Sequence, residues 1–486
     1  MGASAAPLGG SATRLALALA VMMTGCMVGP KYVRPTVPMA KAPDAYKELD
    51  PNWKPATPAD TELKGDWWTL FNEPVLNDLE AKVASANQSL KVSEARFREA
   101  RAQIRINRAS LYPTIGTAPS TVGERYAADR PYFNAASANN GEGDLQLPFD
   151  LNYEIDLWGR VRRTISAAKE ETQASAADLA TAQLSLQTEL AIDYFELRSA
   201  DAQKKLLADT VTDYREALRI TTNRFEGGIS AISDVYQART QLQAALVAES
   251  DVTVARDEYE HAIAVLIGQP PASFSLAEAP LSAQPPIIPT GLPSALLERR
   301  PDIAAAERRT NEANERIGIA RAAFFPSLSL NAAVGFESTS IKSLFNASNF
   351  VYALGPSLSQ TFFDAGRRRA ISEQAYASFD EASANFRQAS LSAFQQVEDN
   401  LTVLRVLSQE SVQQHQATVA AQGAQEIFNN RYVGGIDTYL QVVTAQNAAL
   451  ANERNEIDIM RRRMDSSVLL IKALGGGWST AQLPKY

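Results

Sequence analysis

The chain contains two copies of one structural unit, and this duplication restricts its possible folds more than any other feature. The segment 223–230 (NRFEGGIS) resembles 430–437 (NRYVGGID) at a shift of 207 residues. Upstream, 111–113 (LYP) matches 324–326 (FFP) at a shift of 213, so a loop differs in length between the copies. Two more landmarks keep the shift of 207: Gly159-Arg160 with Gly366-Arg367, and Gly268 with Gly475. Such a fixed spacing indicates an internal repeat.

Each copy contains a helical stretch of unusual length. From 161 to 223 and from 368 to 430 there is no proline and almost no glycine. At about 1.5 Å per residue, a helix of this length extends roughly 95 Å. In the second stretch, apolar residues keep the 3-4-3 spacing of a coiled-coil contact: Phe394, Val397, Leu401 and Leu404. A Gly-Gly pair then reverses the chain, which predicts the helical hairpins 161–267 and 368–474.

Before each hairpin the sequence alternates between apolar and polar residues, which indicates strands with one apolar face. Between 145 and 157 the apolar positions are Leu145, Leu147, Phe149, Leu151, Tyr153, Ile155 and Leu157. The stretch from Thr114 to Val122 alternates less clearly and carries Pro119. The second copy alternates at Leu328, Leu330, Val334 and Phe336, and again at Tyr352, Leu354, Leu358 and Phe362. We expect strand pairs at about 113–157 and 326–363.

Two strands per copy give four per chain, which is too few for a closed barrel, since even small barrels need about eight. A soluble half-buried sheet would explain any single alternating segment. Strands of about ten residues, however, suit a transmembrane barrel. The long helices also need neighbours to bury their apolar faces. The sequence therefore predicts that several chains share one barrel and one helical tube.

The N-terminus predicts export and lipidation. Arg14 precedes a short apolar run, 15–23, and Thr24-Gly25-Cys26 follows, as in a secretory signal with a small-residue cleavage site. The segment 23–26 resembles a lipobox, which makes Cys26, the single cysteine, the lipidation site. Met27 is not the aspartate of inner-membrane retention, which favours the outer membrane. An ordinary signal peptide with an incidental cysteine is the alternative.

Nothing in the composition favours catalysis or nucleic-acid binding. The net charge of −8 gives no basis for binding nucleic acid. The two histidines, His261 and His415, both lie in helical pattern, and no phosphate loop or metal-ligand spacing occurs. Later apolar runs fall short of the ~20 residues that a transmembrane helix needs. We expect no enzyme activity, no cofactor and no metal.

Several motifs together resemble the TolC/OprM-like outer-membrane efflux family, in its lipoprotein (NodT-type) branch. The resemblance covers essentially the whole mature chain, and its carriers are 29–32 (GPKY), Trp67-Trp68 with Phe71, 156–160 (DLWGR), 297–303 (LERRPDI), 322–328 (AAFFPSL) and 473–478 (ALGGGW). It implies a mixed α/β homotrimer in which twelve strands form an outer-membrane barrel continued by a long periplasmic α-helical barrel.

These expectations divide the chain into segments. They are a signal peptide (1–25), a lipid-anchored extension (26–75), repeat 1 (76–270), an equatorial linker (271–300), repeat 2 (301–475) and a tail (476–486).

The resemblance also implies function and partners. Such proteins are passive exit ducts of tripartite efflux systems in the Gram-negative outer membrane. They export small molecules, and they work with a periplasmic adaptor and an inner-membrane transporter, here expected to be of the RND type. A channel for type I protein secretion is one alternative, and a lipid-anchored tether without a pore is another.

Two groups of residues are expected to carry this function. By resemblance, the adaptor docks on the hairpin tips: Arg224, Phe225, Gly227, Gly228, Ile229, Ser230, Arg431, Gly434, Gly435 and Ile436. Ser230 and Asp437 are also expected to cap the returning helices. The periplasmic constriction of the family falls on Leu440, Gln441, Thr444, Asp234, Asp437 and Tyr432.

The constriction departs from the family pattern. Related channels carry acidic residues where this chain has Gln441 and Thr444. Asp234 and Tyr432 match a closed-state network of the family, but its usual arginine is Asp437 here, and two like charges do not form a latch. We therefore expect a polar or apolar constriction that is less cation-selective than an acidic one.

Overall fold

The computed structural model describes residues 27–36, 47, 65–124, 142–281, 284–288 and 296–486. The helices are α2 Pro74–Ala86, α3 Gln88–Ala109, α4 Arg160–Glu226, α5 Ile232–Leu266, α6 Leu296–Arg299, α7 Pro301–Ala322, α8 Arg367–Val433 and α9 Tyr439–Ala473. The strands are β1 Thr114–Thr117, β2 Ser120–Glu124, β3 Glu142–Ile155, β4 Ser327–Ser338 and β5 Phe350–Ser359. Short 3-10 helices are η1 Trp67–Phe71, η3 Pro271–Ser273, η5 Ala347–Asn349 and η6 Thr480–Gln482.

The internal repeat holds residue by residue. Helices α4 and α8 have 67 residues each, and α5 and α9 have 35 each. Both pairs are related by the shift of 207, whereas α3 and α7, with 22 residues each, are related by 213. Gly159 and Gly366 precede the long helices with φ of 81° and 87°, a left-handed conformation that favours glycine. The predicted two-repeat architecture of strands and long helices is confirmed.

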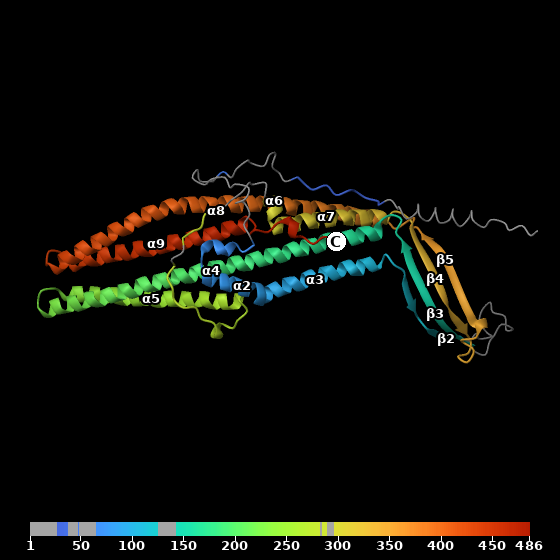
Figure 1. Ribbon diagram of the computed structural model, residues 1–486, viewed down its shortest axis with the longest axis horizontal. Helices are drawn as coiled ribbons and strands as arrows, with labels where there is room; N and C mark the ends of the chain where they lie inside the picture. Colours follow the sequence, from blue (N-terminus) through green and yellow to red (C-terminus); the bar gives the residue numbers. More distant parts are fainter. Residues whose placement is uncertain (1–26, 37–46, 48–64, 125–141, 282–283, 289–295) are drawn as a thin grey trace, which may run out of the picture.

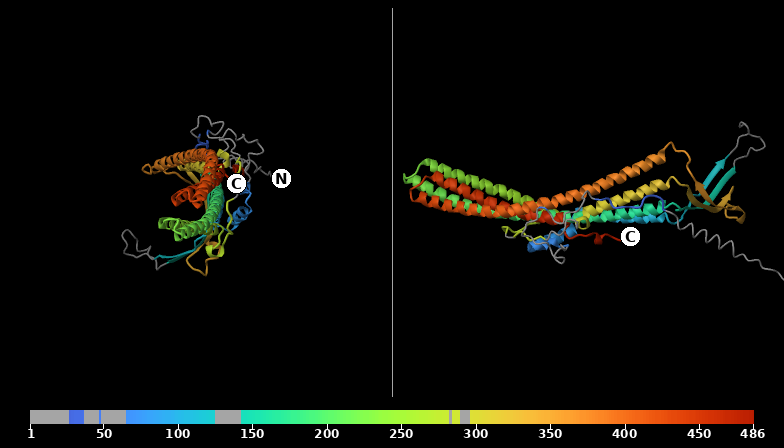
Figure 2. Two further views of the ribbon diagram at one scale, coloured as in Figure 1. Left: turned by 90° about the vertical axis from the view of Figure 1, so that its left-hand side faces the viewer. Right: turned by 90° about the horizontal axis from the view of Figure 1, so that it is seen from above.

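The long helices lie side by side in one curved layer (Figures 1 and 2). Away from the sheet, their order across the layer is α5, α4, α9, α8. Nearer the sheet it is α3, α4, α7, α8. Helix α8 therefore forms one border of the layer, and α3 and α5 form the other. No helix in the described part of the chain is long and apolar enough to cross a membrane.

The strands form one antiparallel sheet at the far end of the helices (Figure 1). Its order is β3, β4, β5, with β1 and β2 both paired to the outer side of β3. The expected single strand over 114–122 is thus two short pieces. The reason is the break at Pro119, which has no N–H to donate to the ladder. The two pieces together occupy the place of one strand, as β4 does in the second copy.

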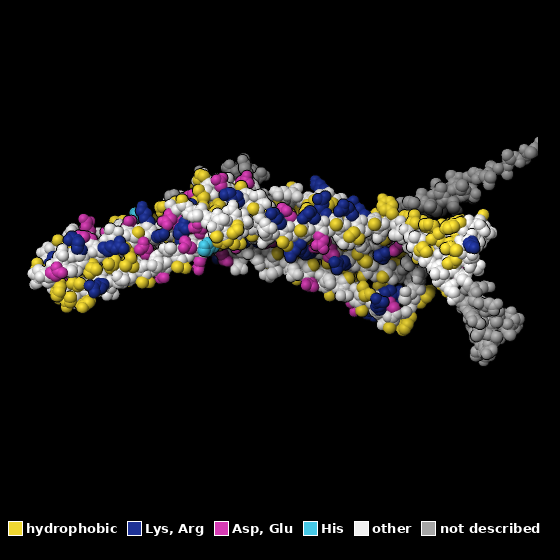
Figure 3. Space-filling model, turned by 90° about the horizontal axis from the view of Figure 1, so that it is seen from below, with side chains coloured by type: hydrophobic (Ala, Val, Ile, Leu, Met, Phe, Trp, Pro, Cys, Tyr) yellow, Lys and Arg dark blue, Asp and Glu magenta, His cyan; other side chains and the backbone are white. Residues whose placement is uncertain are grey.

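One face of this sheet is apolar and the other is polar. Phe149 lies opposite Val334, which lies opposite Tyr352, and the register puts the predicted apolar positions on that same face. Many of these side chains are exposed, including Ile115 at 73% and Leu354 at 70%. Figure 3 shows apolar side chains gathered on the sheet. Residues on the other face include Asn152 and Asn331, whose amides are hydrogen-bonded at 2.8 Å.

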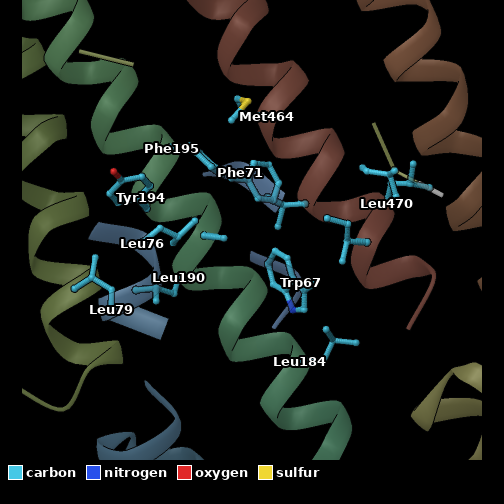
Figure 4. Close-up of a cluster of buried hydrophobic side chains, with 14 of the residues drawn as sticks. Trp67, Phe71, Leu76, Leu79, Leu184, Leu190, Tyr194, Phe195, Met464 and Leu470 are labelled. Carbon is cyan, nitrogen blue, oxygen red and sulfur yellow. The ribbon is translucent and has the colours of Figure 1, made fainter. Parts of the chain in front are cut away.

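The main core lies midway along the molecule, where α2 and η1 pack on α4 and α9 (Figure 4). The rings of Phe71 and Phe195 are 5.0 Å apart, and Trp67 is 2% exposed. The predicted coiled-coil positions contribute to this core: Val397, Leu401 and Leu404 are buried, and Phe394 packs against them.

Candidate functional site

Each hairpin tip is a Schellman turn closed by its second glycine. At the first tip, the Gly228 N–H donates to the Phe225 carbonyl at 2.9 Å, and the Ile229 N–H donates to the Arg224 carbonyl at 2.8 Å. Gly228 has φ of 70° and its counterpart Gly435 has 74°. The first glycines, at −77° and −71°, are in ordinary conformations. Only the second glycine of each pair is therefore required by the backbone.

The prediction that Ser230 and Asp437 cap the returning helices is wrong. The N-cap residues are Ala231 and Thr438, and neither makes a side-chain cap bond. The Schellman turn uses one residue more than expected, so both predicted caps lie one position too early. The Asp437 carboxylate instead accepts a hydrogen bond from the Arg431 guanidinium. The negative charge of Asp437 is therefore paired with Arg431 within its own tip.

Arg224 connects the two tips of one chain. Its guanidinium donates to the carbonyls of Tyr432 and Val433, at 3.1 Å each, where α8 ends. The same group lies over the Tyr432 ring, 4.7 Å from its centre. A cation at a helix C-terminus is favoured by the helix dipole, and stacking on an aromatic ring adds to this. Sequence reasoning placed Arg224 on the docking surface and missed this contact.

A tyrosine pair lies beneath this contact. The rings of Tyr432 and Tyr439 are 5.2 Å apart, and both residues are buried with Ala238 and Val442. Burial is the main cause that raises the pKa of each phenol, and Asp234 raises both further. Both phenols therefore stay protonated at neutral pH. Asp234 therefore lies close enough to the tyrosine pair to influence both phenols.

The other constriction residues lie elsewhere. Leu440 is 55% exposed, and Gln441 and Thr444 are also accessible, on the side of α9 away from the buried Tyr439 and Val442. The Thr444 hydroxyl donates to the Leu440 carbonyl at 2.9 Å. Within one chain these three residues form a polar and aliphatic surface without a formal charge.

The N-terminal segment begins beside the sheet. Cys26 lies outside the described residues, but Met27 packs against Gly159, and the Val28 N–H donates to the Trp158 carbonyl at 3.1 Å. Trp158 stacks on Phe325 at 4.7 Å. The motif 29–32 then runs along α7, where Arg163 and Asn314 both donate to the Pro30 carbonyl. Residue 27 therefore lies where the helices meet the sheet.

A buried charge network holds the linker after α5. Arg256 bonds the carboxylates of Asp201 and Glu260, and Arg198 also bonds Asp201. The network binds the backbone of 276–279: Glu260 and Asp201 accept from the N–H groups of Leu276 and Ala279 at 3.0 Å each. Sequence reasoning missed these four residues, although charged pairs three or four residues apart were visible.

One buried carboxyl has no such partner. Glu80 of α2 is fully buried, and neither oxygen has a hydrogen-bond partner within the described residues. Burial raises the pKa of Glu80 to about 9. The side chain is therefore neutral at physiological pH.

Comparison with known proteins identifies the class of this architecture. The model of the family described as "Outer membrane efflux protein" matches residues 81–269 and 292–476 of this chain. The chain is 32% identical to the toluene efflux pump outer membrane protein TtgF of Pseudomonas putida, over 96% of both chains. It is 31% identical to the pyoverdine export outer membrane protein OpmQ of Pseudomonas aeruginosa, over 85% of this chain and 88% of that one.

Solved structures agree. The outer-membrane channel OprN superposes with a TM-score of 0.85 and 27% identity, over 93% of this chain and all of that one. The CmeC channel of Campylobacter jejuni gives 0.84 and 25%, over 94% and 96%. The chain belongs to the outer membrane efflux protein family. It is the outer-membrane channel component of an efflux pump of a Gram-negative bacterium, and its family is not enzymatic.

Proposed function

We propose that three copies of this chain form one continuous duct across the outer membrane and the periplasm. The sheet carries the proposal, because it is apolar on one face and open at both borders. Within the described residues, β5 pairs only with β4, and β1 and β2 pair only with β3. Unpaired strand borders and an exposed apolar face are both costly in water. Three such sheets joined border to border would make a twelve-stranded barrel with its apolar face toward lipid.

The helices continue this barrel as a periplasmic tube. At about 1.5 Å per residue, α4 and α8 each extend roughly 100 Å, which suits a tube that crosses much of the periplasm. The duct is passive, and the inner-membrane transporter supplies the energy for export. We assign the tips, at the end remote from the sheet, to the periplasmic adaptor, and we expect an inner-membrane transporter of the RND type.

The exposed side chains of the tips support adaptor docking. Ile229 and Ile436 are 71% and 68% exposed and occupy equivalent positions. Phe225 and Val433 add further apolar area at 40% and 54%. Exposed apolar groups beside a turn offer a surface on which the apolar face of a partner helix can pack. The substrates we propose are small and lipophilic, since relatives carry names such as toluene and antibiotic efflux pump proteins.

We further propose that Cys26 carries the lipid anchor of the NodT-type branch. The position of Met27, beside Trp158 and the base of the sheet, supports this. An acyl group on the preceding residue would lie at the level where the apolar face of the sheet begins. The anchor and the barrel would then enter the same leaflet.

Single-channel recording in a planar bilayer, with light scattering on the same purified protein, tests the duct. We expect trimers, stable conductance and weak cation selectivity, because Leu440, Gln441 and Thr444 carry no formal charge. Absence of conductance from a trimer would favour the tether. Strong cation selectivity unaffected by changes at Asp234 and Asp437 would contradict the proposed constriction. Co-purification with an ABC exporter instead of an RND-type transporter would favour protein secretion.

A further inference from the structure

The internal repeat makes one contact inside the chain a template for a contact between chains. Within one chain, the two copies meet where α4 packs against α7 and α9, and we call this contact the inner seam. In the other copy of the repeat, the equivalent of α4 is α8, that of α7 is α3 and that of α9 is α5. The equivalent contact would therefore join α8 of one chain to α3 and α5 of another. These helices are the two borders of the layer (Figure 1).

The inner seam is bridged by ion pairs whose side chains range from buried to partly exposed. Arg163 of α4 bonds Glu315 of α7 at 2.9 Å. Glu170 of α4 accepts from Arg308 of α7 at 3.4 Å. Glu196 of α4 accepts from Arg461 of α9. A fourth pair joins Asp178 to Arg309.

The equivalent positions on the two borders have lost all but one of these charges. Shifting each partner by its own repeat distance gives the following pairs: Ala370 with Ala102, Ala377 with Ala95, Val403 with Val254, and Asn385 with Arg96. Three of the four ion pairs thus become pairs of small or aliphatic residues, and the fourth keeps one charge. In the single chain, Val254 is 58% and Val403 is 37% exposed.

The aliphatic character of the α3 border extends beyond these pairs. On α3, exposed Val92 and Ile106 lie at helical spacing with Ala95 and Ala102, interrupted by Glu99. They form an aliphatic stripe on the side of α3 that corresponds to the α4-facing side of α7. An aliphatic stripe on a helix at the border of a layer needs a partner to remove it from water.

We propose that copies of this chain join through an equivalent of the inner seam that lacks these ion pairs, in which Val403 of α8 packs on Val254 of α5 in the next copy. This rests on the proposed trimer and defines its interface. The occupant is a second copy, because the same chain supplies both halves of a contact whose template it already contains.

The charge difference also gives a reason for correct pairing. A border that packed against the inner-seam face of another copy would supply no charged partner for Glu196 or Arg461. A charge desolvated without a partner is costly, so such an arrangement is disfavoured. The ion pairs therefore direct the two repeats of one chain to each other, and the aliphatic pairs direct whole chains to each other.

Cross-linking of paired cysteines tests this contact in the full-length chain. With Val403→Cys and Val254→Cys together, a short bis-maleimide should give covalent dimers and trimers on a denaturing gel, and either single variant should not. Val419→Cys with Val254→Cys is the matched control. Val419 is 54% exposed on the same helix, but its sixteen-residue distance from Val403 corresponds to roughly 24 Å along α8.

Transplanting the inner-seam ion pair gives a second test. Val403→Glu alone should lower the trimer fraction several-fold in light scattering, since it places a lone carboxylate against a valine. Adding Val254→Arg should restore the trimer, because the two side chains then repeat the pairing of Glu196 with Arg461.

A trimeric wild-type chain whose cysteine pair fails to cross-link, or cross-links no better than the control, overturns the interface while leaving the duct intact. A failure of Val254→Arg to rescue Val403→Glu does the same. A wild-type chain that is monomeric by light scattering overturns the proposed trimer and this interface together.

Discussion

Residues at equivalent positions of the two tips make different contacts. Arg224 reaches across to the end of α8, whereas Arg431 bonds Asp437 within its own tip. Tyr432 is buried with Tyr439, whereas its counterpart Phe225 is 40% exposed. The repeat therefore fixes the turn, and a few substitutions give each tip its own contacts.

The glycine pairs provide a matched test at this scale. Gly228→Ala should destabilise the first tip by about 1–2 kcal/mol, because an L-residue in the left-handed region is strained. Gly227→Ala should have little effect, since that residue has φ of −77°. Hydrogen exchange of the tip amides in both variants measures the difference. Equal protection in the two variants would contradict the assignment of strain to the second glycine.

The raised pKa of the buried Glu80 carboxyl leads us to expect that the stability of the protein falls as the pH rises. The pKa of this carboxyl is raised from 4.5 to about 9, so its contribution to stability is fully present below 4.5 and is lost as the pH rises. The slope approaches about 1.4 kcal/mol per pH unit between these values. Glu80→Gln should flatten the pH dependence of the denaturation midpoint and raise that midpoint at neutral pH. Glu94→Gln, at an exposed position of α3, should keep the wild-type profile.

At the scale of the element, the sheet depends on one close approach. Gly335 of β4 faces Pro148 of β3, and a Cβ atom there would lie 2.2 Å from the Leu147 carbonyl oxygen. A β-strand glycine of this kind marks a place where two backbones come closer than a side chain allows.

Gly335→Ala should therefore disrupt the pairing of β3 with β4. We expect loss of the heat-modifiable band that a folded barrel gives on a gel. Gly355→Ala in β5 is the control, because no atom from the described part of the same chain lies within 4 Å of the Cβ position there. A normal heat-modifiable band from Gly335→Ala would show that the two strands can separate without loss of the sheet.

At the scale of the whole molecule, we expect the proposed lipid anchor and the proposed duct to be separable. The proposed barrel enters the membrane through its own apolar face. Cys26→Ala should therefore abolish incorporation of labelled fatty acid while keeping trimers and conductance. Measuring label, trimer and conductance in one preparation checks this. Loss of the trimer with the label would mean that the anchor is needed for assembly.

The sequence by itself determined the repeat, the long helices and the apolar face of the sheet, because each depends on periodicity that neighbouring residues impose locally. The duplicated glycine pairs likewise marked both tips, since a chain reversal between two helices needs a residue that tolerates positive φ. Only the tertiary structure decided what Arg224 contacts and that Ser230 and Asp437 are not caps. It also decided that Glu80 is buried with no hydrogen-bond partner among the described residues. The surroundings of Arg224 and Glu80 depend on residues far apart in the chain. The cap positions depend on a difference of one residue in where each returning helix begins. No local sequence pattern encodes either.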